Sequence, residues 1–419
     1  AKINIDNIQY EKTDLNSQNN QIKKLNFYYS EDHELFRQSL RNFIQTFSKE
    51  KIDFFVENKD SQRDFFKNLF ELGYFGYEGR GKNDRFNFDS LQGLILNEEI
   101  ARVKSKTFIA INYNFQMTQD YINRLGNQKQ KDTYLLKDKG KVLIGCNATY
   151  ENFDYTNLSS INTIAKRDGD YYLINGSKKI MASGIVSDYF IISCKISNGK
   201  QNDGLSLIII PRFLNGVDVT KKLIIEDFNE DFKTIRFENL EVPVENLLGE
   251  ENQSLDYVFY QNLIGSLSES STSVSITELN LKTIVEYVNT QEYKGEKVSQ
   301  IQSVRHSIAQ MLTEFECSKQ FLYTLYSRFL KEDDLYKEIM MLKFISAKLE
   351  DKVKSNCLKI FYEFGFLEKY STSDFINSEG TNLSENASNS LLDIISNCII
   401  DKESTKTKSK LKKVKSLVR

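Results

Sequence analysis

The sequence has no tryptophan and, in 419 residues, only two prolines, two histidines and five cysteines. The cysteines are dispersed without a C-x-x-C pair, at Cys146, Cys194, Cys317, Cys357 and Cys398. This spacing argues against a disulfide framework or a zinc site and is typical of a protein from a reducing compartment. We therefore expect a cytoplasmic protein with no metal ligands.

The two histidines are the only imidazole groups that could serve as a catalytic base. His33 lies at the expected start of a helix, and His306 follows Arg305 in a helical stretch. Both positions favour a surface or capping role. A Ser-His or Cys-His nucleophile system is therefore not expected.

Long hydrophobic runs and an excess of either charge are also lacking. No run reaches the roughly 18 apolar residues of a membrane span, and the polar first 20 residues contain no signal-peptide core. The formal net charge is −2, from 56 basic and 58 acidic residues. This balance gives no electrostatic reason to expect a nucleic-acid partner.

Periodicity divides the chain into five parts. Residues 1–29 are a polar arm, and 30–142 show helical spacing that begins after Ser30, a plausible N-cap. Residues 143–250 contain short β-rich runs, and 251–400 return to long helical patterns typical of a bundle. Residues 401–419 are rich in lysine. A solvated tail is the favoured interpretation of this last part, with an anchor to an anionic surface as the alternative.

The β-rich part predicts a compact antiparallel domain. Its runs are separated by the turn signals Asp168-Gly169, Asn175-Gly176 and Asn202-Asp203-Gly204. The whole chain is therefore expected to be mainly α with a central β domain.

Five motifs in order resemble those of one family, the acyl-CoA dehydrogenases. The stretch 163–178, TIAKRDGDYYLINGSK, resembles T-x-A-x-x-x-G-D-x-Y-x-L-N-G-x-K of the middle domain. The other matches are the NEEIAR segment at 97–102, LGNQKQK at 125–131, FENLEVPVENLLG at 237–249 and the segment 287–302. Together they cover roughly residues 30–380.

The resemblance implies an N-terminal α domain, a middle antiparallel β domain and a C-terminal helical bundle. It also implies α,β-desaturation of an acyl thioester, carried by CoA or by an acyl carrier protein, with FAD as the cofactor. A homodimer or homotetramer is the expected assembly.

The catalytic base implied by the resemblance is Glu379. The segment Ser378-Glu379-Gly380-Thr381 is similar to the family's Y-E-G-T motif, whose glutamate removes the α proton. An exposed loop residue is the alternative, because the segment between Gly365 and Glu379 lacks the family's Arg-Asp pair. Glu269 is a weaker alternative base.

The resemblance also places candidate contacts to the flavin ring. The family's T-E-P-x-x-G-S-D loop corresponds to 150–157, which keeps Glu151 and offers Thr156, but carries Tyr155 where the family has glycine. The family's W-I-T-N-G strand corresponds to 180–184, with Ala182 and Ser183. We expect Glu151, Thr156 and Ser183 to be cofactor-binding residues.

The contacts to the ADP half of FAD are altered more strongly. Gln291 stands where the family has an arginine, and Lys294 where it has a phenylalanine. Tyr362 and Glu363 replace two glycines of the family's Q-x-x-G-G-x-G turn. Lys294, Gln302 and Thr381 complete the expected cofactor-binding set.

Three hypotheses remain open from the sequence. The first is a divergent flavoenzyme with FAD held by altered contacts. The second is a protein that has lost FAD and performs non-redox chemistry on, or only binds, an acyl thioester. The third is a non-catalytic partner of another protein.

Overall fold

The computed structural model describes residues 29–46, 55, 58–71, 90–103, 105–135, 142–151, 161–181, 184, 187–197, 204–214, 217–219, 224–227, 232–329, 335–365 and 385–400. The chain divides into two compact units. The helical unit consists of Ala1–Thr46, Asp89–Lys106 and Ser266–Ile399, and the β-containing unit of Phe47–Phe88, Thr107–Gly265 and Ile400–Arg419. Each unit is described by itself.

An eight-stranded sheet forms the β-containing unit. Its main strands are β2 (Ile164–Asp168), β3 (Tyr171–Met181), β4 (Tyr189–Ser197), β5 (Ser206–Pro211) and β9 (Phe232–Pro243). The strand order is β10-β5-β4-β2-β3-β9-β8, where β8 is Ile224–Asp227 and β10 is Leu247–Leu248. A further strand, β1 (Gly145–Ala148), pairs with β4 off this path. Two short strands, β6 (Phe213–Leu214) and β7 (Val217–Asp218), form a separate ribbon.

The expectation of an antiparallel domain was wrong for part of this sheet. β4 pairs in parallel with both β1 and β2, whereas β3, β5, β8, β9 and β10 form antiparallel pairs. The sheet is therefore mixed. A parallel pair requires a connection longer than a hairpin turn, and local turn signals do not reveal which distant strand becomes the neighbour.

β4 is an interior strand of the sheet, with apolar side chains buried on both of its faces. Phe190 and Ile192 belong to one core cluster, and Tyr189 and Ile191 to another. The second cluster also contains Met117 of the helix α6 (Lys106–Leu125). A strand that is buried on both faces is continuously apolar, which explains the run YFIISC.

The helices α4 (Lys59–Glu71) and α7 (Gln128–Tyr134) are fixed to the strands by polar contacts. The Asp188 carboxylate pairs with Lys59 at 2.7 Å and with Arg63 at 2.9 Å, and it accepts a hydrogen bond from the Ile144 amide. Gln130 of α7 donates to the backbone oxygens of Glu245 and Leu247. These contacts fix both helices to the ends of the strands.

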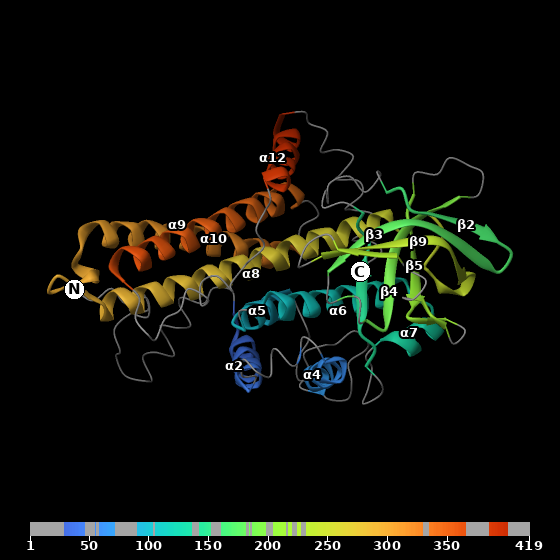
Figure 1. Cartoon of the computed structure of the whole chain (residues 1–419), viewed down its shortest axis with the longest axis horizontal. Coiled ribbons are helices and arrows are strands. Elements are labelled where there is room, and N and C mark those ends of the chain that lie inside the picture. The colour runs from blue at the N-terminus through green and yellow to red at the C-terminus, as the bar shows by residue number, and fades with distance from the viewer. Residues whose placement is uncertain are drawn as a thin grey trace. The chain divides into compact units, whose positions relative to one another are not determined.

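The helical unit contains α2 (Glu31–Gln45), α5 (Ser90–Ala101), most of α8 (Leu255–Thr290), α9 (Gln302–Phe329), α10 (Tyr336–Phe364) and α12 (Glu385–Ile400). Figure 1 shows α9 and α10 running alongside each other. Between α8 and α9 lie the hairpin of β11 (Glu292–Tyr293) and β12 (Glu296–Lys297) and the short helix η6 (Val298–Gln300).

Ser30 caps α2, as the sequence predicts. Its hydroxyl accepts from the His33 backbone amide, and the His33 ring accepts from the Ser30 amide. His33 is therefore a capping residue, which confirms the role expected for it.

The N-E-E-I-A-R motif forms the charged core of the helical unit. Glu99 has a fully buried side chain, and it accepts two hydrogen bonds from Arg41, at 2.7 and 2.9 Å, and one from Arg37. Glu98 accepts from Arg37 and from the Tyr323 hydroxyl. Burial alone would raise the pKa of Glu99, but hydrogen bonds from Arg41 and the charges of Arg102, Arg41 and Arg37 lower it.

Several hydroxyl side chains of α8 form hydrogen bonds within the helix. Ser270, Thr272, Ser275 and Thr277 each donate to the backbone oxygen four residues earlier. All four residues are buried, so their hydrogen bonds to the backbone make this polar stretch compatible with the interior.

All five cysteines are free thiols, as their dispersed spacing predicts. Among the described residues, no helix is both long and apolar enough to cross a membrane.

We expect Glu99→Gln to lower the free energy of unfolding by about 3 kcal/mol, because it leaves arginines next to a buried site without their counter-charge. Urea unfolding followed by circular dichroism measures the effect. Glu34→Gln is the matched control. Glu34 is partly exposed and 3.7 Å from Arg37, so its loss should cost less than about 1 kcal/mol. Equal losses for the two variants would contradict the assigned role of Glu99.

Candidate functional site

The structure describes three of the seven predicted site residues. Glu151, Lys294 and Gln302 lie within the described ranges. Glu379, Thr156, Ser183 and Thr381 lie outside them, as do Tyr155 and Ala182. The region around Glu151 belongs to the β-containing unit and that around Lys294 and Gln302 to the helical unit, and each is described by itself.

Glu151 is held by donors of the protein itself. Its carboxylate accepts from the backbone amides of Asn162 and Thr163, both at 2.7 Å, and from the Thr163 hydroxyl at 2.6 Å. The ammonium group of Lys178 lies 2.9 Å away. The assignment of Glu151 as a flavin contact stays a prediction, and its described contacts tie the chain at residue 151 to the chain at 162–163.

Lys178 is the most deeply buried charge of this region. Its side chain is 0 % exposed, while that of Glu151 is 11 % exposed. Lys178 also donates to the Ser193 hydroxyl, which in turn donates to the Thr149 backbone oxygen at 2.6 Å. We call Glu151, Thr163, Lys178 and Ser193 the clasp.

Burial alone would raise the pKa of the Glu151 carboxyl. The charge of Lys178 and the hydrogen bonds from Thr163 and Asn162 instead lower this pKa below its ordinary value of 4.5. Glu151 is therefore an ionised acceptor at neutral pH, and it cannot serve as a proton donor there.

Asn175-Gly176 is not a turn, so this part of the sequence prediction was wrong. Both residues lie inside β3, and the pairing with β9 shifts register between Ile174 and Gly176. Gly176 has φ +144°, and a Cβ atom there would come within 2.7 Å of the Thr163 Cα. Glycine is needed because the bulged backbone passes directly against the clasp.

Tyr150 provides a contact that the family motifs do not indicate. Its hydroxyl donates to the side-chain oxygen of Asn262 on α8, within the β-containing unit. The Asn262 side-chain nitrogen is buried without a hydrogen-bond partner among the described residues. The only signal in the sequence is a bulky tyrosine directly before Glu151, and nothing local indicates its partner more than 100 residues away.

In the helical unit, the hairpin β11–β12 and the end of α10 lie together. The Tyr287 hydroxyl donates to the Gly365 backbone oxygen, and the Gln291 amide donates to the Phe364 backbone oxygen at 3.1 Å. The Tyr293 ring meets the Phe364 ring edge-on, with centroids 5.2 Å apart. The sequence segments that would hold the ADP half of FAD are therefore neighbours.

Their side chains do not fit a diphosphate in the family's usual way. The Gln291 amide is already bonded to the protein backbone. Tyr362 is 67 % exposed, and Glu363 places an exposed carboxylate beside it. An anionic diphosphate would meet a like charge and aromatic bulk at these positions instead of an arginine and two glycines.

Lys294 and Gln302 are both on the surface. Lys294 lies at the tip of the hairpin with φ +51°, and its ammonium group is 5.1 Å from the Tyr293 ring centroid. Gln302 begins α9, and its side chain is exposed. These contacts do not test the predicted role of Lys294 and Gln302 in cofactor binding, which stays a prediction.

The alternative base, Glu269, is engaged in an ion pair. Its carboxylate lies 2.6 Å from the Lys343 ammonium group, and 27 % of its side chain is exposed. A carboxylate held by a lysine is less free to approach a substrate proton, which weakens this candidate. No cluster of three or more potential metal ligands occurs in the described part of the chain.

Comparisons with known proteins agree across the chain. Models of the N-terminal, middle and C-terminal domains of acyl-CoA dehydrogenases match residues 30–137, 150–239 and 268–394. A subunit of the caffeyl-CoA reductase–Etf complex of Acetobacterium woodii is 24% identical over 82% of this chain and 91% of its own. A short/branched chain specific acyl-CoA dehydrogenase of Bos taurus is 23% identical over 86% of this chain and 84% of its own.

The fold is also shared with solved structures. The crystal structure of an acyl-CoA dehydrogenase from Geobacillus kaustophilus superimposes with a TM-score of 0.77. It covers 89% of this chain and 99% of its own, at 22% identity. This likeness establishes the three-domain architecture.

We expect the clasp to behave as a coupled pair. Glu151→Gln and Lys178→Met should each lower the free energy of unfolding by about 3–5 kcal/mol, because each leaves a buried charge without its partner. The double variant should lose clearly less than the sum of the two. Urea unfolding measures all three.

Lys129→Gln, which removes one member of a highly exposed pair with Glu245, is the control and should have little effect. Strict additivity would argue against the pair.

The clasp should also respond to acid. Because the folded-state pKa of Glu151 is lowered, its stabilisation is present above the ordinary carboxyl pKa and is lost as the pH falls through the folded-state value. The difference in unfolding free energy between the natural protein and Glu151→Gln should therefore shrink below about pH 4.5. Urea titrations from pH 7 to pH 3 measure this difference, and a difference that stays constant would contradict an ionised Glu151.

Proposed function

Because the chain belongs to the acyl-CoA dehydrogenase family, we propose that it is a flavin-dependent oxidoreductase that acts on an acyl thioester. This proposal is supported by the match of all three domains of the family, in order, over most of the chain. In the reaction, the α carbon loses a proton to a carboxylate and the β carbon loses a hydride, so that a double bond forms between them. FAD, when bound, accepts the hydride.

The proposed base is Glu379. The weaker alternative, Glu269, is paired with the Lys343 ammonium group at 2.6 Å. A general base must be free to approach the proton that it removes, and a carboxylate with several bonded donors is a poor one. Glu379 is therefore proposed as the base because of its place in the Ser378-Glu379-Gly380-Thr381 segment, which is similar to the family's motif.

The substrate is proposed to be an acyl thioester of CoA or of an acyl carrier protein, and the protein to act as a homodimer or homotetramer. The five free thiols support a reducing, cytoplasmic location. The reaction can run in either direction, as oxidation of the Cα–Cβ single bond or as reduction of the double bond. One similar protein is named as part of a caffeyl-CoA reductase complex and another as a 3-(aryl)acrylate reductase, while others are named dehydrogenases.

A second candidate function follows from the altered ADP contacts. Gln291, Tyr362 and Glu363 give a nucleotide diphosphate no favourable contact at the positions where the family holds it. A protein that had lost FAD would retain the fold and would bind the acyl thioester, with non-redox chemistry or none. Flavin content separates this candidate from the first.

The purified protein should carry, or take up, a flavin with maxima in the visible range. Saturated acyl-CoA should bleach it under anaerobic conditions, and an unsaturated acyl-CoA should reoxidise the reduced protein. Glu379→Gln should slow the bleaching by about 10²–10⁴-fold, the usual contribution of a general base. Stopped-flow absorbance measures both rates.

Glu269→Gln is the matched control, because it removes a carboxylate that already has a partner and should leave the bleaching rate nearly unchanged. A colourless protein that takes up no added FAD would overturn the flavoenzyme proposal. In that case, a change in the acyl-CoA product that depends on Glu379 would indicate non-redox chemistry. An unchanged acyl-CoA would indicate a binding protein.

A further inference from the structure

The last helix of the helical unit, α12, becomes less buried along its length. Ser388 and Leu391 are 4 % and 5 % exposed, whereas Leu392 is 45 % and Ile399 58 % exposed. Figure 1 shows α12 projecting away from α9 and α10 instead of running alongside them. The start of α12 is therefore packed within the unit, and its last two turns present apolar side chains to the surroundings.

The exposed apolar side chains share one side of the helix. Leu392, Ile395 and Ile399 are three and four positions apart, which places them on one face. Ile395, between the other two, is half-buried. Asp393 is the single charged residue in the sequence from 391 to 400, and the helical period places it on another side. We call Leu392, Ile395 and Ile399 the apolar face. Exposed apolar groups that lie together in this way mark interaction sites for proteins or membranes.

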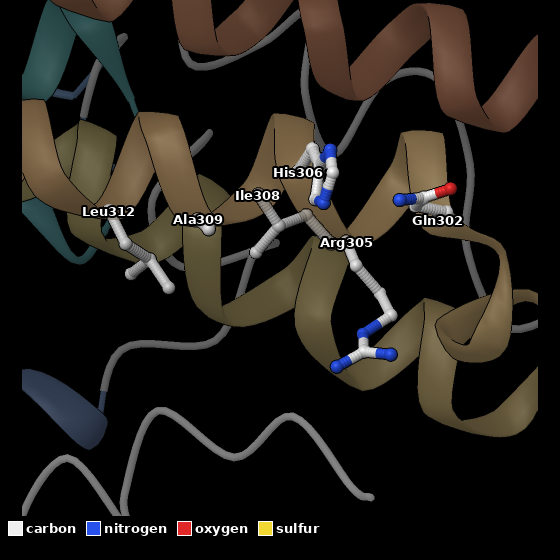
Figure 2. Close-up of a pocket in the computed structure, with 6 residues that line it drawn as sticks. All are labelled: Gln302, Arg305, His306, Ile308, Ala309 and Leu312. Atoms are coloured by element: carbon white, nitrogen blue, oxygen red, sulfur yellow. The ribbon is translucent and has the colours of Figure 1, made fainter.

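The apolar face lies outside the pocket on the surface of α9. That pocket has a volume of about 470 Å³, and all of its lining residues belong to α9, from Gln302 to Leu312 (Figure 2). Small molecules bind in concave sites that enclose most of their surface. A projecting helix with exposed apolar side chains is better suited to an extended partner.

The sequence that follows α12 is strongly basic. Residues 401–419 lie outside the described part of the chain, and their sequence contains eight basic and two acidic residues, although the whole chain has a formal net charge of −2. Leu411, Val414, Leu417 and Val418 recur among the lysines three or four positions apart. This spacing is typical of basic sequences that bind at membrane surfaces. Its position directly after the apolar face favours an anchor to an anionic surface over a solvated tail.

We propose that α12 and the basic segment 401–419 attach the protein to an anionic lipid surface. The apolar face enters the boundary between headgroups and acyl chains, and the lysines lie against the anionic headgroups. A nucleic acid would neutralise the lysines but leave the apolar face in water. A hydrophobic protein surface would cover the apolar face but leave the lysines without a counter-charge. An anionic membrane satisfies both, and this inference does not depend on the proposed function.

Flotation of the full-length protein with lipid vesicles tests the proposal without any measurement of activity. Vesicles that contain phosphatidylserine should bind the protein at least about tenfold more tightly than vesicles of phosphatidylcholine alone, because only the former attract the lysines. Raising the ionic strength from about 0.1 M to about 1 M shortens the Debye length from about 10 Å to about 3 Å and should weaken this binding.

Two sets of substitutions separate the apolar from the basic contribution. Leu392→Ser combined with Ile399→Ser should weaken binding to phosphatidylserine vesicles at least about tenfold, because two apolar side chains no longer leave water. Lys410→Gln combined with Lys412→Gln and Lys413→Gln should weaken it roughly a hundredfold, since each lysine near an anionic membrane contributes about a factor of five.

Matched controls carry the same kinds of substitution elsewhere. Leu35→Ser changes a side chain of α2 that is 58 % exposed. Lys129→Gln combined with Lys166→Gln and Lys348→Gln removes three exposed lysines outside the basic segment. Both controls should bind vesicles as tightly as the natural protein does. Circular dichroism melting curves establish that every variant is folded.

A natural protein that binds phosphatidylserine vesicles no better than phosphatidylcholine vesicles would overturn the proposal. Losses of equal size in the variants and in their matched controls would do the same. If Leu392→Ser with Ile399→Ser lowers the molar mass measured by light scattering but leaves vesicle binding unchanged, the apolar face joins two copies of the chain and the proposal is rejected. Binding to double-stranded DNA by a protein that binds no vesicles would assign the lysines to a nucleic acid and also reject it.

Discussion

A charged side chain inside a protein must meet its counter-charge at hydrogen-bond distance, and both units of this chain are built around that constraint. In the β-containing unit, the buried ammonium group of Lys178 pairs with Glu151 and donates a hydrogen bond to Ser193, which lie on different segments. In the helical unit, the buried carboxylate of Glu99 does the same with arginines of α2. Removing one partner leaves the other as an unpaired charge in the low-dielectric interior. These pairs therefore determine which segments lie side by side.

Much of this arrangement could be predicted from the sequence where the signal is local. Ser30 precedes a helical pattern and caps it, and the order of helical and β-rich parts is visible in the periodicity. The residues around Glu99 carry one of the motifs that indicate the family. In such cases a few neighbouring residues determine the outcome through capping, burial and charge.

Contacts between distant segments could not be predicted in this way. The parallel pairing of β4 with β1 and β2 depends on which strands meet, and Asn175-Gly176 has the composition of a turn but forms a bulge because the strand has to pass Thr163. The bond between Tyr150 and Asn262 joins positions 112 residues apart.

The clasp has an evolutionary consequence. One carboxylate, that of Glu151, holds the chain at 151 and again at 162–163, so the sequence between these points can change without altering the register of the sheet. Substitutions between these two points are therefore expected to leave the pairing of β2 with β3 and β4 intact.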